Sequence, residues 1–274
     1  MEMQVITVYC ICDDLVKYFE IKDDIQAKMS TSEVLTTAIT AAMFFAGNQE
    51  RARIFLKEHN YIPNMLSKSQ FNRRLHAIST HLLESIFDVL GEVFKNTNES
   101  NEYAVDSFPI SVCKNIRISR SKIYKKQEEY RGKCVSKHEY FYGVRVHMIT
   151  TIQGDPIEMI IAPGSYHDST IFKQFQLDLP EKSYLYADSG FTDYKYEDLI
   201  NDASGINFLV ARRSNSKRQH KPWISALISH SRKFIESTFS KINSLFPKSI
   251  HAVNAKGFEL KVFFFALAHS FNSL

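Results

Sequence analysis

Three acidic side chains occupy positions from which they could act together. Asp106 and Asp188 each follow a short segment rich in Tyr, Val and Leu, a composition that predicts buried strands. Glu236 lies on a predicted long helix, beside its apolar face. Acids at the ends of two strands of one sheet can face each other across a cleft, so the sequence predicts a site of three carboxylates.

A cluster of this kind needs a cation or a proton. Two close carboxylates repel each other by roughly 4 kcal/mol at a typical effective dielectric constant. Oxygen ligands without Cys select Mg²⁺ or Mn²⁺ over zinc, and two such ions can activate a hydroxyl and stabilise the leaving oxygen of a phosphodiester. We therefore predict that Asp106, Asp188 and Glu236 are catalytic ligands of two Mg²⁺ ions (Mn²⁺ can substitute), with Asp106 bridging both ions.

Each acid also has a simpler explanation. Taken alone, Asp106 is better explained as a side chain that caps the following turn. A serine-hydrolase site at Asp188-Ser-Gly lacks the Gly-x-Ser-x-Gly turn that such enzymes use. The pair His167-Asp168 either supports the site or starts a helix; we favour a helix cap for Asp168 and leave His167 open. The pairing of Asp106 with Asp188 and Glu236 favours the metal site over the turn cap.

Composition and charge narrow the class of protein. With 274 residues, 44% hydrophobic and 23% charged, the chain is typical of a folded protein with a core. The net charge of +4 is unevenly distributed: residues 1–100 hold 10 Lys/Arg and 13 Asp/Glu, which leaves 24 and 17 for residues 101–274. A basic second part attracts a polyanion, although an ordinary solvated basic surface has the same composition.

Cysteine spacing and hydropathy predict the compartment. Cys10, Cys12, Cys113 and Cys134 form no Cys-x-x-Cys pair and no zinc spacing, so we expect reduced thiols. The first residues include Glu2 and lack the early basic residues of a secretory signal. The apolar run 262–268 is too short to span a bilayer. These features predict a cytoplasmic protein without membrane contact.

The first part of the chain, residues 1–95, predicts a helical domain. Ser67 and Gln70 form a capping-box pattern at the start of a long helix whose apolar residues recur in steps of three and four: Phe71, Leu75, Ile78, Leu82, Ile86 and Leu90. A helix-turn-helix with polar and basic residues on the exposed face can read DNA. The candidates for DNA contact are Gln70, Asn72, Arg73 and Arg74. Any amphipathic surface helix has the same pattern.

Residues 101–274 predict a second, α/β domain after a polar boundary at 95–101. The expected strands cover 102–108 (closed by Pro109), 139–152, 157–162, 183–188 and 206–211, and the expected helices cover 168–175, 193–201, 224–246 and 257–271. Gly154-Asp-Pro156 predicts a hairpin turn between the second and third strands.

Two basic stretches flank these acids. Residues 114–137 hold nine Lys/Arg with two interleaved tyrosines, and residues 212–233 hold seven Lys/Arg, no acid and one tryptophan. Such segments can grip phosphates and stack on unpaired bases, whereas the alternative is a solvated loop. The candidates for DNA contact are Arg120, Lys125, Lys126, Arg212, Arg213, Lys217, Arg218, Arg232 and Lys241.

Several motifs carry a family resemblance that spans nearly the whole chain. Val-Asp106-Ser, Ala-Asp188-Ser-Gly and Arg232-x-x-x-Glu236 resemble the DDE triad of bacterial insertion-sequence transposases. The segments 66–75 (LSKSQFNRRL), 164–168 (GSYHD) and 235–240 (IESTFS) resemble insertion-sequence family 982 in particular.

The resemblance implies an RNase H-like catalytic core, a mixed sheet flanked by helices, behind a helix-turn-helix-like helical domain. It also implies metal-dependent cleavage at the terminal inverted repeats of a mobile element and strand transfer into target DNA by a homo-oligomer. Several related transposases carry Tyr-x2-Arg-x3-Glu-x6-Lys. Here Ser229 and Asn243 replace the Tyr and Lys, so Arg232 is the candidate phosphate contact and the role of Lys241 stays open. A simple ion pair between Arg232 and Glu236 is the alternative.

Three hypotheses follow. The first is a transposase, the second is a metal-dependent nuclease of the same fold that does not join strands, and the third is a DNA-binding repressor without catalysis. Dependence of DNA binding or cleavage on metal and on the three acids separates the third hypothesis from the others.

Overall fold

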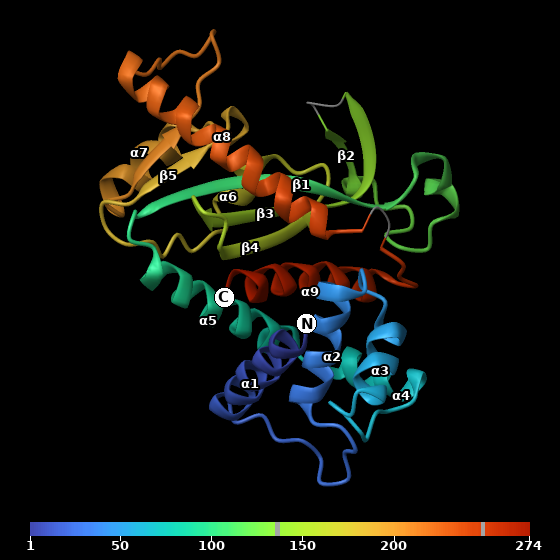
Figure 1. Ribbon diagram of the computed structural model, residues 1–274. Coiled ribbons are helices and arrows are strands. Elements are labelled where there is room, and N and C mark those ends of the chain that lie inside the picture. Colours follow the sequence, from blue (N-terminus) through green and yellow to red (C-terminus); the bar gives the residue numbers. More distant parts are fainter. Residues whose placement is uncertain (135–137, 248–249) are drawn as a thin grey trace. The chain divides into compact units, whose positions relative to one another are not determined.

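The computed structural model describes residues 1–134, 138–247 and 250–274 (Figure 1). The chain divides into two compact units. A helical unit combines residues 1–89 with 245–252 and 256–274, and a sheet-containing unit combines residues 90–244 with 253–255. The last helix therefore belongs to the same compact unit as the N-terminal helices. The domain boundary expected at residues 95–101 stays a prediction. Within the described ranges, no helix is both long enough and apolar enough to cross a membrane.

The helical unit contains α1 (Glu2–Tyr18), α2 (Thr31–Phe44), α3 (Gln49–Glu58), α4 (Lys68–Ala77), the first half of α5 (Thr80–Thr97) and α9 (Ala255–Ser273). Helix α2 is buried along most of its length, and its buried residues include threonines as well as apolar side chains. Its N-terminus carries a complete capping box between Ser30 and Glu33. The four cysteines of the chain are free thiols, as predicted.

The long helix predicted after Ser67 is wrong, because the chain breaks at Ile78. Ile78 has extended backbone angles (ψ 131°), and the Ser79 hydroxyl accepts the backbone N–H of Leu82 at 3.1 Å, which starts a new helix. A side-chain cap can interrupt a continuous apolar pattern, since it satisfies the N–H groups exposed by the break. The predicted capping box of Ser67 and Gln70 is confirmed at the start of α4.

The sheet has six strands in the order β2-β3-β1-β5-β6, with β4 also paired to β3. Their bounds are β1 (Glu102–Cys113), β2 (Arg131–Cys134), β3 (Glu139–Thr151), β4 (Pro156–Pro163), β5 (Tyr184–Ala187) and β6 (Asn207–Val210). β1 is antiparallel to β3 and parallel to β5, so the sheet is mixed. The predicted hairpin between β3 and β4 is confirmed, with Gly154 at a φ of +113° in its turn.

Helices cover both faces of this sheet (Figure 1). On one face, Phe108 of β1 meets Phe239 of α8 (Pro222–Leu245), with ring centroids 6.4 Å apart. On the other face, Phe172 of α6 (Asp168–Phe172) stacks on Phe208 of β6. Helix α7 (Tyr194–Ala203) packs on that second face through Tyr196. The predicted mixed α/β architecture is therefore confirmed.

Two details of the sheet differ from prediction. Pro109 does not close β1, which continues to Cys113 and places Asp106 in mid-strand rather than at a strand end. Proline is tolerated there because β1 pairs with β5 only through Val105, so one side of the strand beyond that point has no ladder partner. Strand β2 and two short 3₁₀ helices, Asn115–Arg120 and Glu128–Tyr130, lie within the first basic stretch. The end of that stretch, residues 135–137, lies outside the described residues.

Candidate active site

Asp106 and Asp188 are brought side by side by the parallel pairing of β1 with β5. The ladder ends at Val105 opposite Ala187, so the next residue on each strand is one of the two acids. Both are partly exposed, and each carboxylate accepts the backbone N–H of the following serine, Ser107 at 2.7 Å and Ser189. Residues in register point to the same face of a sheet, here the face that α8 covers.

Glu236 is linked to this pair through Arg232. On α8, a guanidinium nitrogen of Arg232 lies 3.6 Å from a carboxylate oxygen of Glu236 and 3.7 Å from one of Asp188. The i,i+4 ion pair is therefore present, and the same guanidinium also contacts the strand end. The Glu236 side chain is 69% exposed, so it borders solvent as predicted from its helix position.

The surroundings of Asp106 disfavour the ionised form of its carboxyl group. Burial raises the pKa of the Asp106 carboxyl to about 7, and the neighbouring carboxylates of Asp188 and Asp168 act in the same direction. The backbone N–H of Ser107 and the guanidinium of Arg232 oppose this rise. A cation placed beside Asp106 and Asp188 relieves the repulsion, since an opposite charge within a few ångströms favours the ionised form.

A fourth acid, Asp168, lies next to these residues in a network with Arg145 and His147, two residues that the sequence did not indicate. The Ser107 hydroxyl donates to Asp168 at 2.7 Å, and the Arg145 guanidinium lies 3.8 Å from the same carboxylate oxygen. His147 is fully buried, with its Nδ1 3.5 Å from that oxygen. Burial lowers the pKa of His147 to about 4, which keeps the imidazole neutral. Arg145 and His147, two polar residues spaced by two within the buried part of β3, were the available signal.

The expected helix cap by Asp168 is wrong. His167 is the N-cap residue of α6, and no side chain makes a capping hydrogen bond there. The Asp168 carboxylate, in the first turn of α6, instead accepts a hydrogen bond from Ser107, the residue after Asp106 on β1.

The three acids have the type of ligand atom that a hard divalent cation prefers, but they do not lie close enough together to hold one. Asp106, Asp188 and Glu236 offer only carboxylate oxygens, the ligands that Mg²⁺ and Mn²⁺ prefer. Among residues 1–134, 138–247 and 250–274, no three His, Cys, Asp or Glu side chains are grouped closely enough to hold an ion. Arg232 lies between Asp188 and Glu236 in this arrangement.

On α4, the predicted DNA contacts have different environments. The Gln70 side chain accepts the N–H and hydroxyl of Ser67, Asn72 is half-buried and Arg73 is exposed. Arg74 forms an ion pair with Asp23 at 2.6 Å and donates to the carbonyl of Met29 at 3.2 Å. Arg74 therefore stabilises the helical unit, whereas Arg73 extends into solvent.

In the first basic stretch, Arg120, Lys125 and Lys126 are exposed. Tyr124 and Tyr130 stack on each other with ring centroids 3.5 Å apart, and Tyr124 is buried. This pairing makes Tyr124 part of the loop's own packing, and stacking of these tyrosines on bases stays a prediction. The Tyr142 hydroxyl fixes the same loop by donating to the carbonyl of Tyr124.

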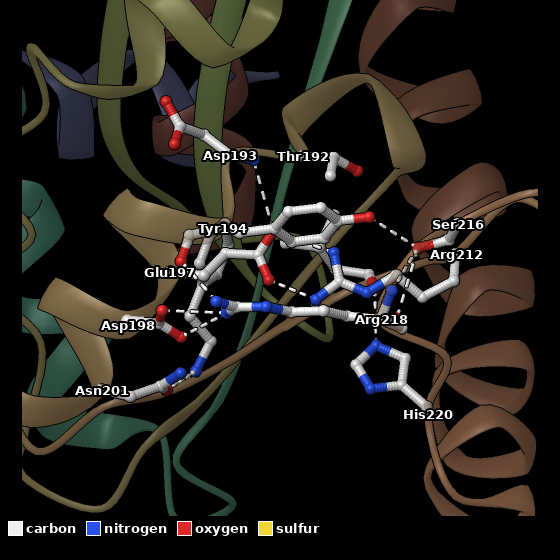
Figure 2. Close-up of polar contacts among 12 residues, drawn as sticks. Thr192, Asp193, Tyr194, Glu197, Asp198, Asn201, Arg212, Ser216, Arg218 and His220 are labelled. Carbon is white, nitrogen blue, oxygen red and sulfur yellow. Dashed lines mark hydrogen bonds and ion pairs between the residues drawn. The ribbon is translucent and has the colours of Figure 1, made fainter.

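In the second basic stretch, Arg212 and Arg218 form ion pairs with acids of α7 (Figure 2). Arg212 is buried in a bidentate pair with Glu197, and Arg218 pairs with Asp198 at 2.7 Å. The two guanidiniums also lie 5.1 and 5.0 Å from the Tyr194 ring. Separating this pair would leave a buried charge without a partner, so Arg212 has a structural role, and its contact with DNA stays a prediction.

Other residues of that stretch remain on the surface. Arg213 and Lys217 are exposed, and the Arg213 guanidinium lies 3.4 Å from the hydroxyl of Ser189, next to Asp188. Trp223 is 66% exposed at the start of α8, and Lys241 is exposed near its end. Arg213 and the partly exposed Arg232 therefore place guanidinium groups next to Asp188.

Comparison with known proteins bears on this arrangement. No curated protein and no solved structure matches the chain. Residues 96–251, more than half of the chain, match the family model described as a transposase DDE domain. The match contains the whole sheet, all three predicted acids and both basic stretches. By this match, the chain belongs to the transposase DDE-domain family.

Proposed function

We propose that the protein is a DNA transposase that cleaves DNA at the ends of an insertion sequence and transfers the cut strands into target DNA. The observation that carries the proposal is the adjacency of Asp106 and Asp188 on neighbouring strands, with Arg232 joining Asp188 to Glu236. The strand order, with β1 parallel to β5 and antiparallel to β3, supports an RNase H-like core. The motifs quoted above support insertion-sequence family 982.

Each site residue has a proposed role in this reaction. Asp106, Asp188 and Glu236 would hold two Mg²⁺ or Mn²⁺ ions, and bound ions supply activation of the attacking hydroxyl and stabilisation of the leaving oxygen. Arg232 and Arg213 bind phosphates of the strand that is cut, because both place a guanidinium beside the acids. Arg120, Lys125, Lys126, Lys217 and Lys241 bind the DNA backbone farther away.

The helical unit would recognise the terminal inverted repeats. In this proposal α4 contacts DNA through its exposed Arg73, with Gln70 and Asn72 beside it, as the second helix of a helix-turn-helix-like domain. Synapsis of two ends requires a homo-oligomer. The protein would act in the cytoplasm, at the nucleoid of a bacterium.

The test is cleavage of a plasmid that carries the DNA flanking the gene. We expect nicking at inverted repeats in Mg²⁺, with no nicking by Asp106→Asn, Asp188→Asn or Glu236→Gln although each variant still binds the same DNA. Asp178→Asn is the matched control, since the Asp178 side chain is 76% exposed and pairs with Lys95. Wild-type cleavage by any of the three variants contradicts the proposed triad.

A second assay tests strand joining. Pre-cut ends incubated with a target plasmid should become joined to it. Cleavage without joining identifies a nuclease, and metal-independent binding without cleavage identifies a repressor; either result overturns the transposase.

A further inference from the structure

Asp168 touches both chain segments that carry the acidic pair. Its carboxylate accepts a hydrogen bond from the hydroxyl of Ser107, the residue after Asp106. Gly190, two residues after Asp188, packs so closely on the other carboxylate oxygen that an added Cβ would lie 3.0 Å from it. One side chain therefore contacts β1 just after Asp106 and the segment that follows the end of β5.

The Ser107 residue connects Asp168 to Asp106 in two steps. Its hydroxyl donates to Asp168 at 2.7 Å, and its backbone N–H donates to the Asp106 carboxylate at 2.7 Å. The same hydroxyl accepts a hydrogen bond from Arg145 at 3.2 Å, so both of its bonding directions are used. A serine held in this way has a fixed orientation, and so does the N–H that it presents to Asp106.

Arg145 and His147 enclose the network from β3. The Arg145 side chain is only 15% exposed and also donates to the carbonyl of Lys133 at 3.1 Å. His147 is paired with Ser107 in the β1–β3 ladder, and neither of its ring nitrogens has a hydrogen-bond partner among the described residues. A buried imidazole directed at Asp168 excludes water from that side, which strengthens the remaining contacts of the carboxylate.

We infer that Asp168 is a positioning residue of the acidic site, which sets the separation and orientation of Asp106 and Asp188 through Ser107 and Gly190. This inference rests on the proposed function, because it assigns Asp168 to the support of a metal site. Asp168 lies on the face of the sheet opposite Asp106, so it acts through these residues and not as a ligand. Residues that orient ligands in this way typically change metal affinity by about 10- to 100-fold when they are replaced.

The experiment measures Mn²⁺ binding to the full chain by electron paramagnetic resonance of the free ion. We expect Asp168→Asn and Ser107→Ala to weaken Mn²⁺ binding by about 10- to 100-fold. Ser107→Thr keeps the hydroxyl and restores binding, and Asp178→Asn leaves it unchanged. If Asp168 contributed only to stability, a variant whose circular dichroism spectrum matches that of the wild type would bind Mn²⁺ with wild-type affinity.

Wild-type Mn²⁺ affinity in folded Asp168→Asn or Ser107→Ala overturns the positioning role. If Asp168→Asn does not fold, Ser107→Ala decides, because it leaves the pair of Asp168 with Arg145 in place. Asp106→Asn and Asp188→Asn are measured in parallel, and unchanged binding by both overturns the metal site together with its support. If the Mn²⁺ results are as expected but the wild type cuts no DNA, the proposed function fails and the positioning role stands.

Discussion

Asp23 shows how a single carboxylate can organise its surroundings. It accepts hydrogen bonds from the backbone N–H and hydroxyl of Thr31 at 2.8 and 2.7 Å, and it pairs with Arg74 of α4. Burial acts to raise the pKa of Asp23, but the hydrogen bonds from Thr31 and Arg74 together hold it below its usual value. The loop before α2, the start of α2 and α4 are thereby joined through one side chain.

Asp23→Asn should lower the free energy of unfolding at pH 7 by about 1.5–3 kcal/mol, the range for hydrogen bonds to a charged group. A lowered folded-state pKa stabilises above the unfolded pKa and loses that contribution as the pH falls through the folded value. The difference between variant and wild type should therefore shrink at pH 3. Urea denaturation followed by circular dichroism at both pH values measures it.

Asp24→Asn is the control for this prediction. Asp24 is exposed, and its side chain accepts only the N–H of Gln26 among the hydrogen bonds described. An equal loss of stability in both variants, or a loss at Asp23 that does not depend on pH, contradicts the proposed linkage.

At the scale of elements, ion pairs attach the segment between β6 and α8 to α7. From the sequence alone, the arginines of these pairs look the same as arginines that contact DNA. Arg212 and Glu197 are both buried, whereas Arg218 and Asp198 are both about half exposed. Gln219 fastens the segment further by donating to the carbonyl groups of Arg213 and Ser214. A fixed segment presents Arg213 beside Ser189 at little cost in conformational entropy.

Glu197→Gln should destabilise the protein by about 3–5 kcal/mol, because it leaves the buried Arg212 without its partner. Asp198→Asn removes an exposed pair and should cost at most about 1 kcal/mol. Thermal and urea unfolding of the two variants measure these losses. Equal stability of Glu197→Gln and Asp198→Asn contradicts the structural role of Arg212.

At the scale of the molecule, charge is distributed unevenly between the two parts of the sequence. Residues 1–100 hold 10 basic and 13 acidic residues and carry a net charge of −3. Residues 101–274 hold 24 basic and 17 acidic residues and carry a net charge of +7. DNA affinity should therefore depend on the basic surface of the sheet-containing unit and fall steeply with salt.

Replacing Arg120, Lys125 and Lys126 together by alanine should weaken binding to a random-sequence duplex and reduce the slope of log K against log[KCl] by about 2–3, since each phosphate contact contributes about 0.9. Fluorescence anisotropy across a KCl series measures the slope. Alanine at Lys22, Lys28 and Lys57 makes the same change in net charge on exposed sites of the first part and is the control. Equal slope changes in the two triple variants contradict a localised DNA surface.

The local sequence pattern determined most of the elements. Runs of β-prone residues located β3 to β6, the capping box located the start of α4, and the acids Asp106, Asp188 and Glu236 lie within the stretch that matches a transposase DDE domain. These features depend on neighbours in the chain. Side-chain caps, backbone period and short motifs can be recognised without knowledge of distant contacts.

Tertiary structure decided which charged residues share a site. The burial of Arg212 against Glu197 and the pairing of Arg74 with Asp23 depend on partners 15 and 51 residues away, which no local pattern specifies. The network around Asp168 joins β1, β3 and α6, and it exists only because the β1–β3 ladder aligns Ser107 with His147. The sequence predicted a site of carboxylates, and the register of β1 with β5 placed Asp106 beside Asp188.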